Sequence, residues 1–152
     1  MNPHEFRAEI VDPALRLLDL HSPAASNLLL GTALVESNLV YRRQKGGGPA
    51  LGLFQIEPTT FDDIYRRYLP RQTSWLGSVN TLLRPYDMPI EQLVDNDRFA
   101  CAIARLKYRM ARPPLPLADD IEGLAAYWRL HYNAGGKGTV ERFVALYRAR
   151  VT

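Results

Sequence analysis

The chain has 152 residues, of which 47% are hydrophobic and 23% charged, and its formal net charge is +3. This balance predicts a single globular domain over residues 1–152 and excludes an intrinsically disordered chain. No apolar run approaches the roughly 20 residues that a membrane-spanning helix needs. The only cysteine, Cys101, excludes an intrachain disulfide, and the three histidines lack metal-ligand spacing, so we expect neither a metal nor a cofactor.

The mild positive charge favours polyanionic partners, namely nucleic acid, anionic lipid or the peptide carboxylates of a cell wall. The arginines are spread along the chain, and no run of five or more like charges indicates a nucleic-acid arm. Residues 1–7 lack a basic start followed by an apolar stretch, so no signal peptide is expected. We therefore expect neither nucleic-acid binding nor stable membrane insertion.

Two residue pairs ending in proline predict the first helices. Asp12-Pro13 is typical of an N-cap followed by a first-turn proline, and it predicts a helix over 14–20. Ser22-Pro23 repeats the pattern and predicts a helix that continues to about Leu39. Within the second helix the spacing of apolar residues places Glu36 beside an apolar stripe, near the C-terminal end.

The rest of the chain predicts loops and further helices. Residues 41–51 hold three consecutive glycines and a proline, which a helix tolerates only at large cost, so we expect a surface loop. Helices are predicted from Pro58 to Pro70, over 75–83, from Asp95 or Asn96 to about Arg112, over 119–132 and over 139–150. No long segment alternates with period two. The fold class expected is therefore mainly α, with little or no β-sheet.

Glu36 is a candidate proton donor because partial burial disfavours a carboxylate and raises the pKa of the group. An apolar strip, Gly52-Leu53-Phe54-Gln55, begins sixteen residues later, and Tyr132-Asn133 lies near the C-terminus. Breaking a glycosidic bond needs a proton for the leaving oxygen and stabilisation of a cationic sugar. Gln55 and Asn133 offer amides to sugar hydroxyls or N-acetyl groups, and Tyr132 offers an aromatic face or a hydroxyl.

Each of these residues also has an ordinary interpretation when taken alone. A glutamate at a helix end is usually solvated. The ordinary role of a residue such as Gln55 is to satisfy backbone groups of its own strip, without any contact to a ligand. Tyr132-Asn133 before a glycine is typical of a helix C-terminus.

Taken together and in this order, the three segments resemble the lysozyme-like superfamily, and more closely its soluble lytic transglycosylase and goose-type lysozyme branch. That branch carries a Glu-Ser pair at a helix end, then Gly-Leu-Met-Gln, then Ala-Tyr-Asn-Ala-Gly. The matching segments are Glu36-Ser37, Gly52-Leu53-Phe54-Gln55 and His131-Tyr132-Asn133-Ala134-Gly135. The resemblance covers about residues 25–147, and it implies a lysozyme-like helical domain that binds the glycan strands of peptidoglycan.

The resemblance implies a role for each matching residue. Glu36 would be the catalytic acid and then the base, and Ser37 would orient it or contact substrate. Gln55, Tyr132 and Asn133 would line a groove for alternating N-acetylglucosamine and N-acetylmuramic acid. In the transglycosylase reaction the 6-hydroxyl of muramic acid attacks its own anomeric carbon and gives a 1,6-anhydro product, so one carboxyl group suffices.

Three departures from the family pattern stand out. The loop between Glu36 and Gly52 lacks the usual Pro, Ala and Ser spacing, and His131 stands where the family often has alanine. Glu57 occupies a position that is usually apolar in bacterial transglycosylases and is an aspartate in goose-type lysozymes. Glu57 is therefore either a second carboxylate that favours hydrolysis or a residue that suits the N-terminus of the helix at Pro58.

The sequence thus favours a peptidoglycan-cleaving enzyme, either a lytic transglycosylase or a muramidase. With no signal peptide expected, it predicts a phage-type protein made in the cytoplasm, an endolysin or a virion-borne enzyme with other virion proteins as partners. Two other classes stay open. One is a non-catalytic wall-binding or virion protein on the same fold, and the other is a helical nucleic-acid-binding domain.

Overall fold

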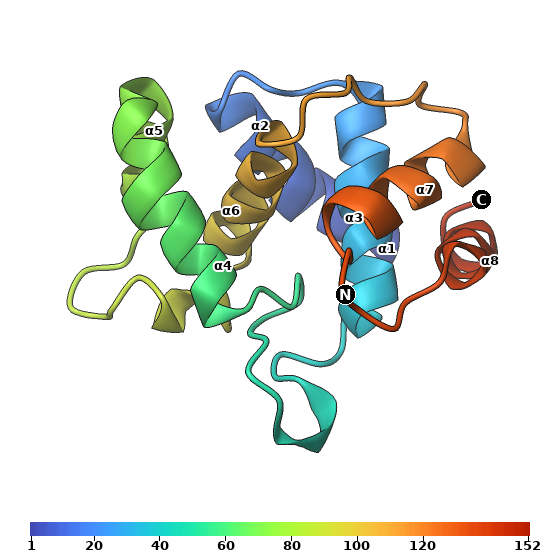
Figure 1. Ribbon diagram of the computed structural model, residues 1–152, viewed down its shortest axis with the longest axis horizontal. Helices are drawn as coiled ribbons and strands as arrows, with labels where there is room; N and C mark the ends of the chain where they lie inside the picture. Colours follow the sequence, from blue (N-terminus) through green and yellow to red (C-terminus); the bar gives the residue numbers. More distant parts are fainter.

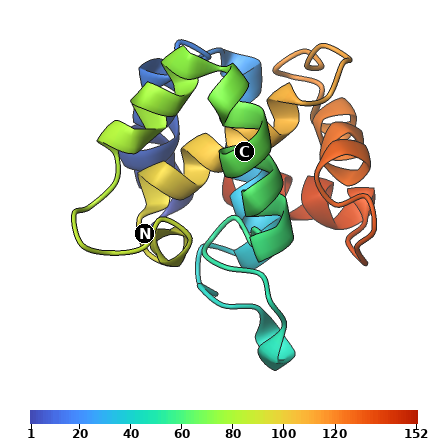
Figure 2. The same ribbon diagram turned by 60° about the vertical axis from the view of Figure 1, so that its left-hand side comes forward.

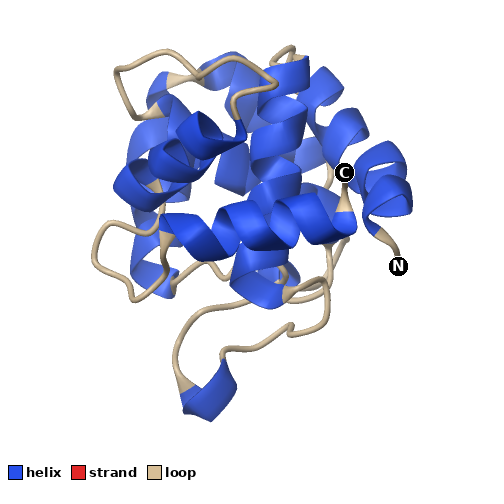
Figure 3. Ribbon diagram, turned by 90° about the vertical axis from the view of Figure 1, so that its right-hand side faces the viewer, coloured by secondary structure: helices blue, strands red, loops and turns tan.

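The computed structural model describes residues 1–152, and Figure 1 shows a molecule built from helices. The α-helices are α1 (Pro3–Phe6), α2 (Asp12–Leu17), α3 (Pro23–Ser37), α4 (Pro58–Asp62), α5 (Thr73–Thr81), α6 (Asp97–Arg109), α7 (Ile121–His131) and α8 (Val140–Arg150). Two π-helical segments, η1 (Arg7–Val11) and η3 (Asp63–Tyr68), and the 3-10 turns η2 (Lys45–Gly47), η4 (Leu69–Arg71) and η5 (Glu91–Leu93) complete the set. No strand forms, which confirms the mainly α prediction (Figure 3).

The helix predicted over 14–20 corresponds to α2, which ends at Leu17, but its predicted start was wrong because helical structure begins well before Asp12-Pro13. Asn2 is the N-cap: its side chain accepts from the Glu5 backbone N–H at 2.9 Å. The Glu5 carboxylate in turn accepts from the Asn2 N–H at 3.4 Å, which completes a capping box. The helix then continues through η1 into α2.

Pro13 lies inside this helical run, and the surrounding structure compensates for its missing N–H. The π-helical segment η1 directly precedes α2, and the Asp12 N–H bonds the Arg7 carbonyl. The carbonyl of Glu9, four residues before Pro13, instead accepts a hydrogen bond from Arg98 Nε of α6 at 2.7 Å. A distant arginine therefore supplies the donor that the proline lacks.

Helix α3 forms the centre of the molecule and packs against α7 and α8 (Figure 1). Its start is as predicted, since the Ser22 hydroxyl accepts from the Ala25 N–H at 3.0 Å. Nearly every side of α3 is buried, and Gly31 lets α8 approach, because a Cβ there would lie 2.2 Å from Phe143 Cζ. The helix ends at Ser37 rather than Leu39, where Asn38 (φ 54°) and Leu39 (φ 59°) turn left-handed.

The helices α4 and α5 form a separate arm on one side of α6 (Figure 2). Aromatic rings join the arm to the core: Phe61 stacks on Tyr65 at 5.1 Å between centroids, and Phe99 of α6 meets Phe61 edge-on at 6.1 Å. Within the arm, α4, η3 and η4 follow one another without a break up to Arg71. The predicted end near Pro70 is therefore one residue early.

The loop between α3 and α4 projects from the helical body and returns through a tight turn (Figure 3). Leu51 and Ile56 pair their backbones at 2.9 and 3.0 Å, which pinches the chain around Gly52 and Gln55. Gly52 has φ +76°, and a Cβ there would lie 1.8 Å from the Leu93 carbonyl oxygen. Only glycine fits this position, and the turn it allows sets where Gln55 points.

The remaining helix boundaries lie close to their predicted places. Asn96, rather than Asp95, caps α6, and that helix ends at Arg109 instead of Arg112. Asp120 caps α7 and Thr139 caps α8 through their side chains. Cys101 is fully buried in the core. None of the helices has the length and apolar character required to cross a bilayer.

Candidate active site

A groove lies at the C-terminal end of α3, beside the side chain of Glu36. Its central cavity has a volume of about 720 Å³ and is lined by Glu36, Gln44, Ala50, Gln55, Glu57, Thr60, Lys107, His131, Tyr132, Asn133, Ala134, Gly135, Gly136 and Lys137. Two smaller cavities of about 360 and 320 Å³ adjoin it and share lining residues with it. The fold thus brings Glu36, Gln55, Glu57, Tyr132 and Asn133 to one cavity, from three separate segments of the chain.

One oxygen of the Glu36 carboxyl group is held by two donors. Trp128 Nε1 donates to Oε1 at 3.0 Å, and Asn133 Nδ2 donates to the same oxygen at 3.3 Å. The other oxygen, Oε2, has no hydrogen-bond partner in the protein. A proton on this carboxyl group therefore belongs on Oε2, since Oε1 already accepts two hydrogen bonds.

The pKa of Glu36 is raised above its ordinary value, chiefly because burial disfavours the carboxylate. The hydrogen bonds from Trp128 and Asn133 and the charge of Lys107 act in the opposite direction and do not cancel the effect of burial. The group thus stays protonated to a higher pH than a solvated glutamate. When it is ionised, Trp128 and Asn133 stabilise the carboxylate by hydrogen bonds.

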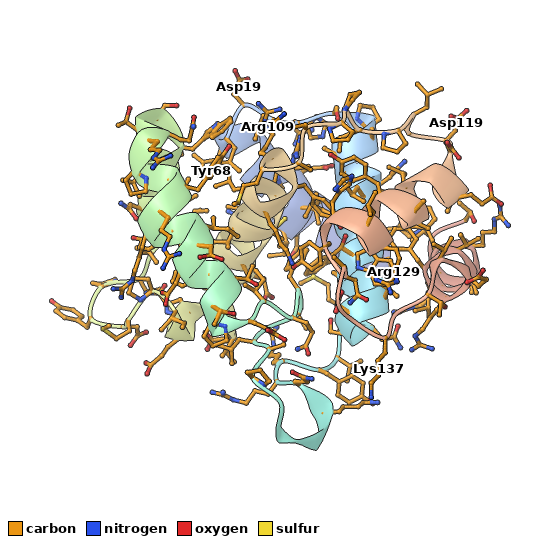
Figure 4. All side chains as sticks on the ribbon, in the orientation of Figure 1. Asp19, Tyr68, Arg109, Asp119, Arg129 and Lys137 are labelled. Atoms are coloured by element: carbon orange, nitrogen blue, oxygen red, sulfur yellow. The ribbon has the colours of Figure 1, made fainter.

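The Asn133 amide is fixed in the orientation that Glu36 requires. The Gly138 N–H donates to Asn133 Oδ1 at 3.2 Å, so the NH₂ group is the one that faces Glu36. Arg129, labelled in Figure 4 on α7, donates to the Asn133 carbonyl. The backbone and side chain of Asn133 are therefore both held from the α7–α8 side of the molecule.

Tyr132 ties the C-terminal segment to the apolar strip. It is 6% exposed, its hydroxyl donates to the Phe54 carbonyl at 2.6 Å, and its ring stacks on Tyr108 at 5.1 Å between centroids. The phenol oxygen is thus engaged by backbone. Tyr132 lines part of the groove. Its larger contribution is to hold Phe54 in place through the hydrogen bond to the Phe54 carbonyl.

Ser37 ties the strip to the end of α3 in the same way. It is 2% exposed, and its Oγ lies 2.7 Å from the Leu53 carbonyl and 3.0 Å from the Ala33 carbonyl. Ser37 and Tyr132 therefore hold consecutive residues of the strip, Leu53 and Phe54, from two different helices. The three sequence segments are joined by these side-chain-to-backbone hydrogen bonds.

Gln55 and Glu57 line the same cavity as the C-terminal segment, and they lie on and just after the tight turn. Gln55 Nε2 donates to the Gly52 carbonyl at 2.9 Å, so part of its amide satisfies the turn itself. Glu57 is exposed and is the N-cap residue of α4, but its side chain makes no capping hydrogen bond. The carboxylate of Glu57 therefore borders the same cavity as Glu36 without being held by any neighbour.

Two residues of the site were missed by reasoning from sequence. Trp128 lies four residues before Tyr132 on the same face of α7, and this spacing is a signal that was available. Lys107 of α6 had no such signal. Its Nζ donates to the Tyr132 carbonyl at 2.7 Å and lies 4.2 Å from the centre of the Tyr132 ring.

Lys107 also places a positive charge between the two carboxyl groups of the groove. Burial lowers the pKa of Lys107, and the charges of Glu36 and Glu57 act against that decrease. Lys107 in turn lowers the pKa of Glu36. The cation therefore adds to the effect of Trp128 and Asn133 on the pKa of Glu36, which burial dominates, and it holds the backbone next to Asn133.

Three further cations border the groove near the projecting loop. Lys45 and Arg142 line the smaller cavity beside Glu36, and Lys137 lines the central one (Figure 4). None of the three forms an ion pair, and the Lys45 ammonium lies 3.9 Å from the centre of the Tyr41 ring. At the other end, Met110 and Leu130 give the groove an apolar surface.

No cluster of three or more His, Cys, Asp and Glu side chains has the arrangement needed to hold a metal ion. No protein-family model, no curated protein and no solved structure matches this chain. The site is therefore interpreted from its own geometry.

Proposed function

We propose that this protein cleaves the glycan strands of peptidoglycan between N-acetylmuramic acid and N-acetylglucosamine, by lytic transglycosylase chemistry. The observation that carries the proposal is the state of Glu36. Its carboxyl group has a raised pKa, one oxygen held by Trp128 and Asn133, and the other oxygen without a partner at the wall of a long groove. These are the properties required of a general acid.

In the first step, Glu36 donates its proton from Oε2 to the glycosidic oxygen as the bond from that oxygen to the anomeric carbon of muramic acid breaks. The negative charge that develops on Glu36 is stabilised by the donors at Oε1 and by Lys107. The sugar becomes cationic at its anomeric carbon, and the leaving sugar keeps the proton as a hydroxyl group.

In the second step, the 6-hydroxyl of the same muramic acid attacks the anomeric carbon, and the Glu36 carboxylate takes the proton of that hydroxyl. A 1,6-anhydro ring forms, and Glu36 returns to its protonated state. The cycle uses one carboxyl group twice and consumes no water. The use of a single carboxyl group agrees with the structure, in which Glu36 is held by hydrogen bonds and the side chain of Glu57 makes none.

The end of the groove near the projecting loop favours a strand that carries acidic substituents. Lys45, Lys137 and Arg142 have no ionic partner in the protein, so they are available to the peptide carboxylates of the wall. Lys45 and Arg142 border the smaller cavity that includes Glu36 itself. A substituted glycan would therefore be attracted to the part of the groove where the bond is cut.

Muramidase hydrolysis is the second candidate, and the position of Glu57 favours it. Glu57 borders the central cavity and makes no capping hydrogen bond, so it is free to activate a water molecule. In that mechanism water, rather than the 6-hydroxyl, attacks the anomeric carbon. The product would have a reducing end instead of an anhydro ring.

We further propose that the protein acts on the cell wall after phage-type release or delivery, with other virion proteins as partners if it is virion-borne. This route rests on the resemblance to phage-type wall-cleaving enzymes in the sequence. It is tested by locating the protein in cell fractions during infection. Recovery of the protein only from host cytosol, with no wall-associated or virion-associated fraction at lysis, would contradict it.

The chemistry is tested by mass spectrometry of the muropeptides released from purified sacculi. The proposal predicts anhydro-muramic acid ends from the first minutes of the digestion. Reducing ends as the initial product would replace the transglycosylase with the muramidase. Reduction of the sample with borohydride before analysis separates the two, because anhydro ends do not react.

A further inference from the structure

A second polar cavity lies where α6 ends and the proline-rich connector to α7 begins. It has a volume of about 220 Å³ and is lined by Arg105, Tyr108, Arg109, Ala111, Arg112, Pro113, Pro114, Leu115 and Tyr127. It shares no residue with the cavity around Glu36 and only Ala111 with the apolar end of the groove. Figure 4 labels Arg109 at this end of α6, far from Lys137 at the groove.

Three guanidinium groups surround this cavity, and no carboxylate does. Arg105 and Arg109 are four residues apart on one face of α6, and Arg112 follows three residues after the helix has ended. Like charges at this spacing destabilise a helix unless a counter-charge lies between them. None of the three arginines forms an ion pair with an acidic residue of the protein.

Arg105 is the unusual member of the group. It is 6% exposed, yet its side chain donates no hydrogen bond to any protein group, and its buried Nε has no partner. Burying a charged group without a counter-charge or acceptor is expensive. Burial and then the nearby Arg109 lower the pKa of Arg105, and the groups that oppose this decrease are two tyrosines and a cysteine rather than a carboxylate.

Arg109 and Arg112 have simpler explanations when considered alone. Both are exposed, and a basic residue at the C-terminal end of a helix is favourable with the helix dipole. Arg105 lies a full turn before that end and is buried, so neither solvent nor the dipole accounts for it. The missing partner is therefore an acceptor that carries negative charge and enters the cavity.

We propose that this cavity binds a small phosphate-type oxyanion, held by Arg105 at its base and by Arg109 and Arg112 at its mouth. A guanidinium presents several donors in a planar fork, which matches the oxygens of phosphate and of a phosphate ester. Three positive charges without a carboxylate favour an anion that carries more than one charge. The cavity volume also leaves room for a small alcohol substituent on the phosphate.

The binding is tested by titrating the purified full-length protein with inorganic phosphate, at constant ionic strength set with chloride. Calorimetry is expected to give a saturable single site, and saturating phosphate should raise the melting temperature by roughly 5 °C. Glycerol phosphate and a glycerophosphodiester serve as further ligands. Stronger binding of either ester than of inorganic phosphate would identify a phosphorylated polymer or lipid headgroup, rather than free phosphate, as the source.

Arg105→Met gives the sharpest variant, because it fills the space without the charge. Without phosphate the variant should melt at a higher temperature than the wild type, since it removes an unpaired buried charge. With phosphate its melting temperature should not change. Arg112→Gln, at an exposed position, should keep the fold and weaken phosphate binding roughly fivefold, and it decides the question if Arg105→Met does not fold.

Arg148→Gln is the matched control, because it removes one exposed arginine of α8, outside the cavity, that pairs with Glu122 of α7. It should bind phosphate as the wild type does. A wild-type protein that shows no saturable phosphate effect would overturn the proposal. So would an equal loss of binding in Arg148→Gln, because the effect would then come from overall charge.

Discussion

The two glutamates that border the central cavity are held in opposite ways. Glu36 stands at the end of a buried helix, accepts hydrogen bonds from Trp128 and Asn133, and has a raised pKa. Glu57 stands at the exposed start of a short helix and is held by no side chain. Under the proposed mechanism, proton transfer therefore depends on the firmly held Glu36, and Glu57 has at most a secondary role.

The wall that carries Glu57 depends on the turn at Gly52. Gly52→Ala should destabilise the protein by about 3 kcal/mol or more, because the residue has a left-handed backbone and would meet the Leu93 carbonyl. Thermal unfolding should show a melting temperature lowered by roughly 6 °C or more. Gly77→Ala in α5, where nothing lies within 4 Å, is the control and should raise stability by about 0.5–1 kcal/mol.

The next variant removes the indole N–H of Trp128, which is one of the two donors that hold Glu36. Trp128→Phe should lower the rate of glycan cleavage roughly tenfold to a hundredfold, because the developing carboxylate loses a hydrogen bond. The same change raises the pKa of Glu36 further, so the fall in rate at alkaline pH should occur at higher pH.

The control for Trp128→Phe is Trp75→Phe, which removes an indole N–H that donates to the Leu18 carbonyl away from the groove. It should affect stability and leave the pH profile of cleavage where it is. A similar loss of rate in the two variants would mean that the indole of Trp128 acts only by packing.

Lys107 connects the two sides, since it interacts electrostatically with both glutamates. Lys107→Met should lower the rate roughly tenfold and move the alkaline limb of the pH–rate profile to higher pH, because the cation lowers the pKa of Glu36. Lys107→Arg keeps the charge and should restore the position of the limb. An unchanged profile in Lys107→Met would show that Lys107 only supports the Tyr132 backbone.

The smallest effect is expected from Glu57→Gln. A transglycosylase should lose less than about threefold in rate, as for other exposed charges. A hydrolase that uses Glu57 to activate water should lose roughly a hundredfold or more. Comparing initial rates with the product analysis decides whether the two glutamates share the chemistry, and near-full activity on either product removes the second-carboxylate hypothesis.

The sequence predicted the local features of the fold better than the long-range ones. Ser22-Pro23 opened α3 as predicted because a side-chain cap is a local interaction. Asp12-Pro13 gave the wrong helix start, because Pro13 is tolerated inside a longer helical run. The donor that compensates for its missing N–H, Arg98, lies far along the chain. Residues of the three motifs lie together at the groove, and the hydrogen bonds of Ser37 and Tyr132 that join those motifs became visible only in three dimensions.

The cation at the site illustrates the same limit. Lys107 sits on α6 next to buried positions and belongs to no motif, so its position above the Tyr132 ring followed only from how α6 and α7 pack. The burial that raises the pKa of Glu36 also comes from residues distant in sequence. Motif order therefore indicates the residues of the candidate site, whereas packing raises the pKa of Glu36.

The most direct test of Glu36 is the digestion of purified sacculi by the wild type and by Glu36→Gln, with binding to sacculi measured in parallel. The wild type should release anhydro-muropeptides, and Glu36→Gln should bind equally well but cleave at least about a hundredfold more slowly. If both proteins bind and neither cleaves, the chain is a non-catalytic wall-binding protein and the account of Glu36 as an acid is wrong.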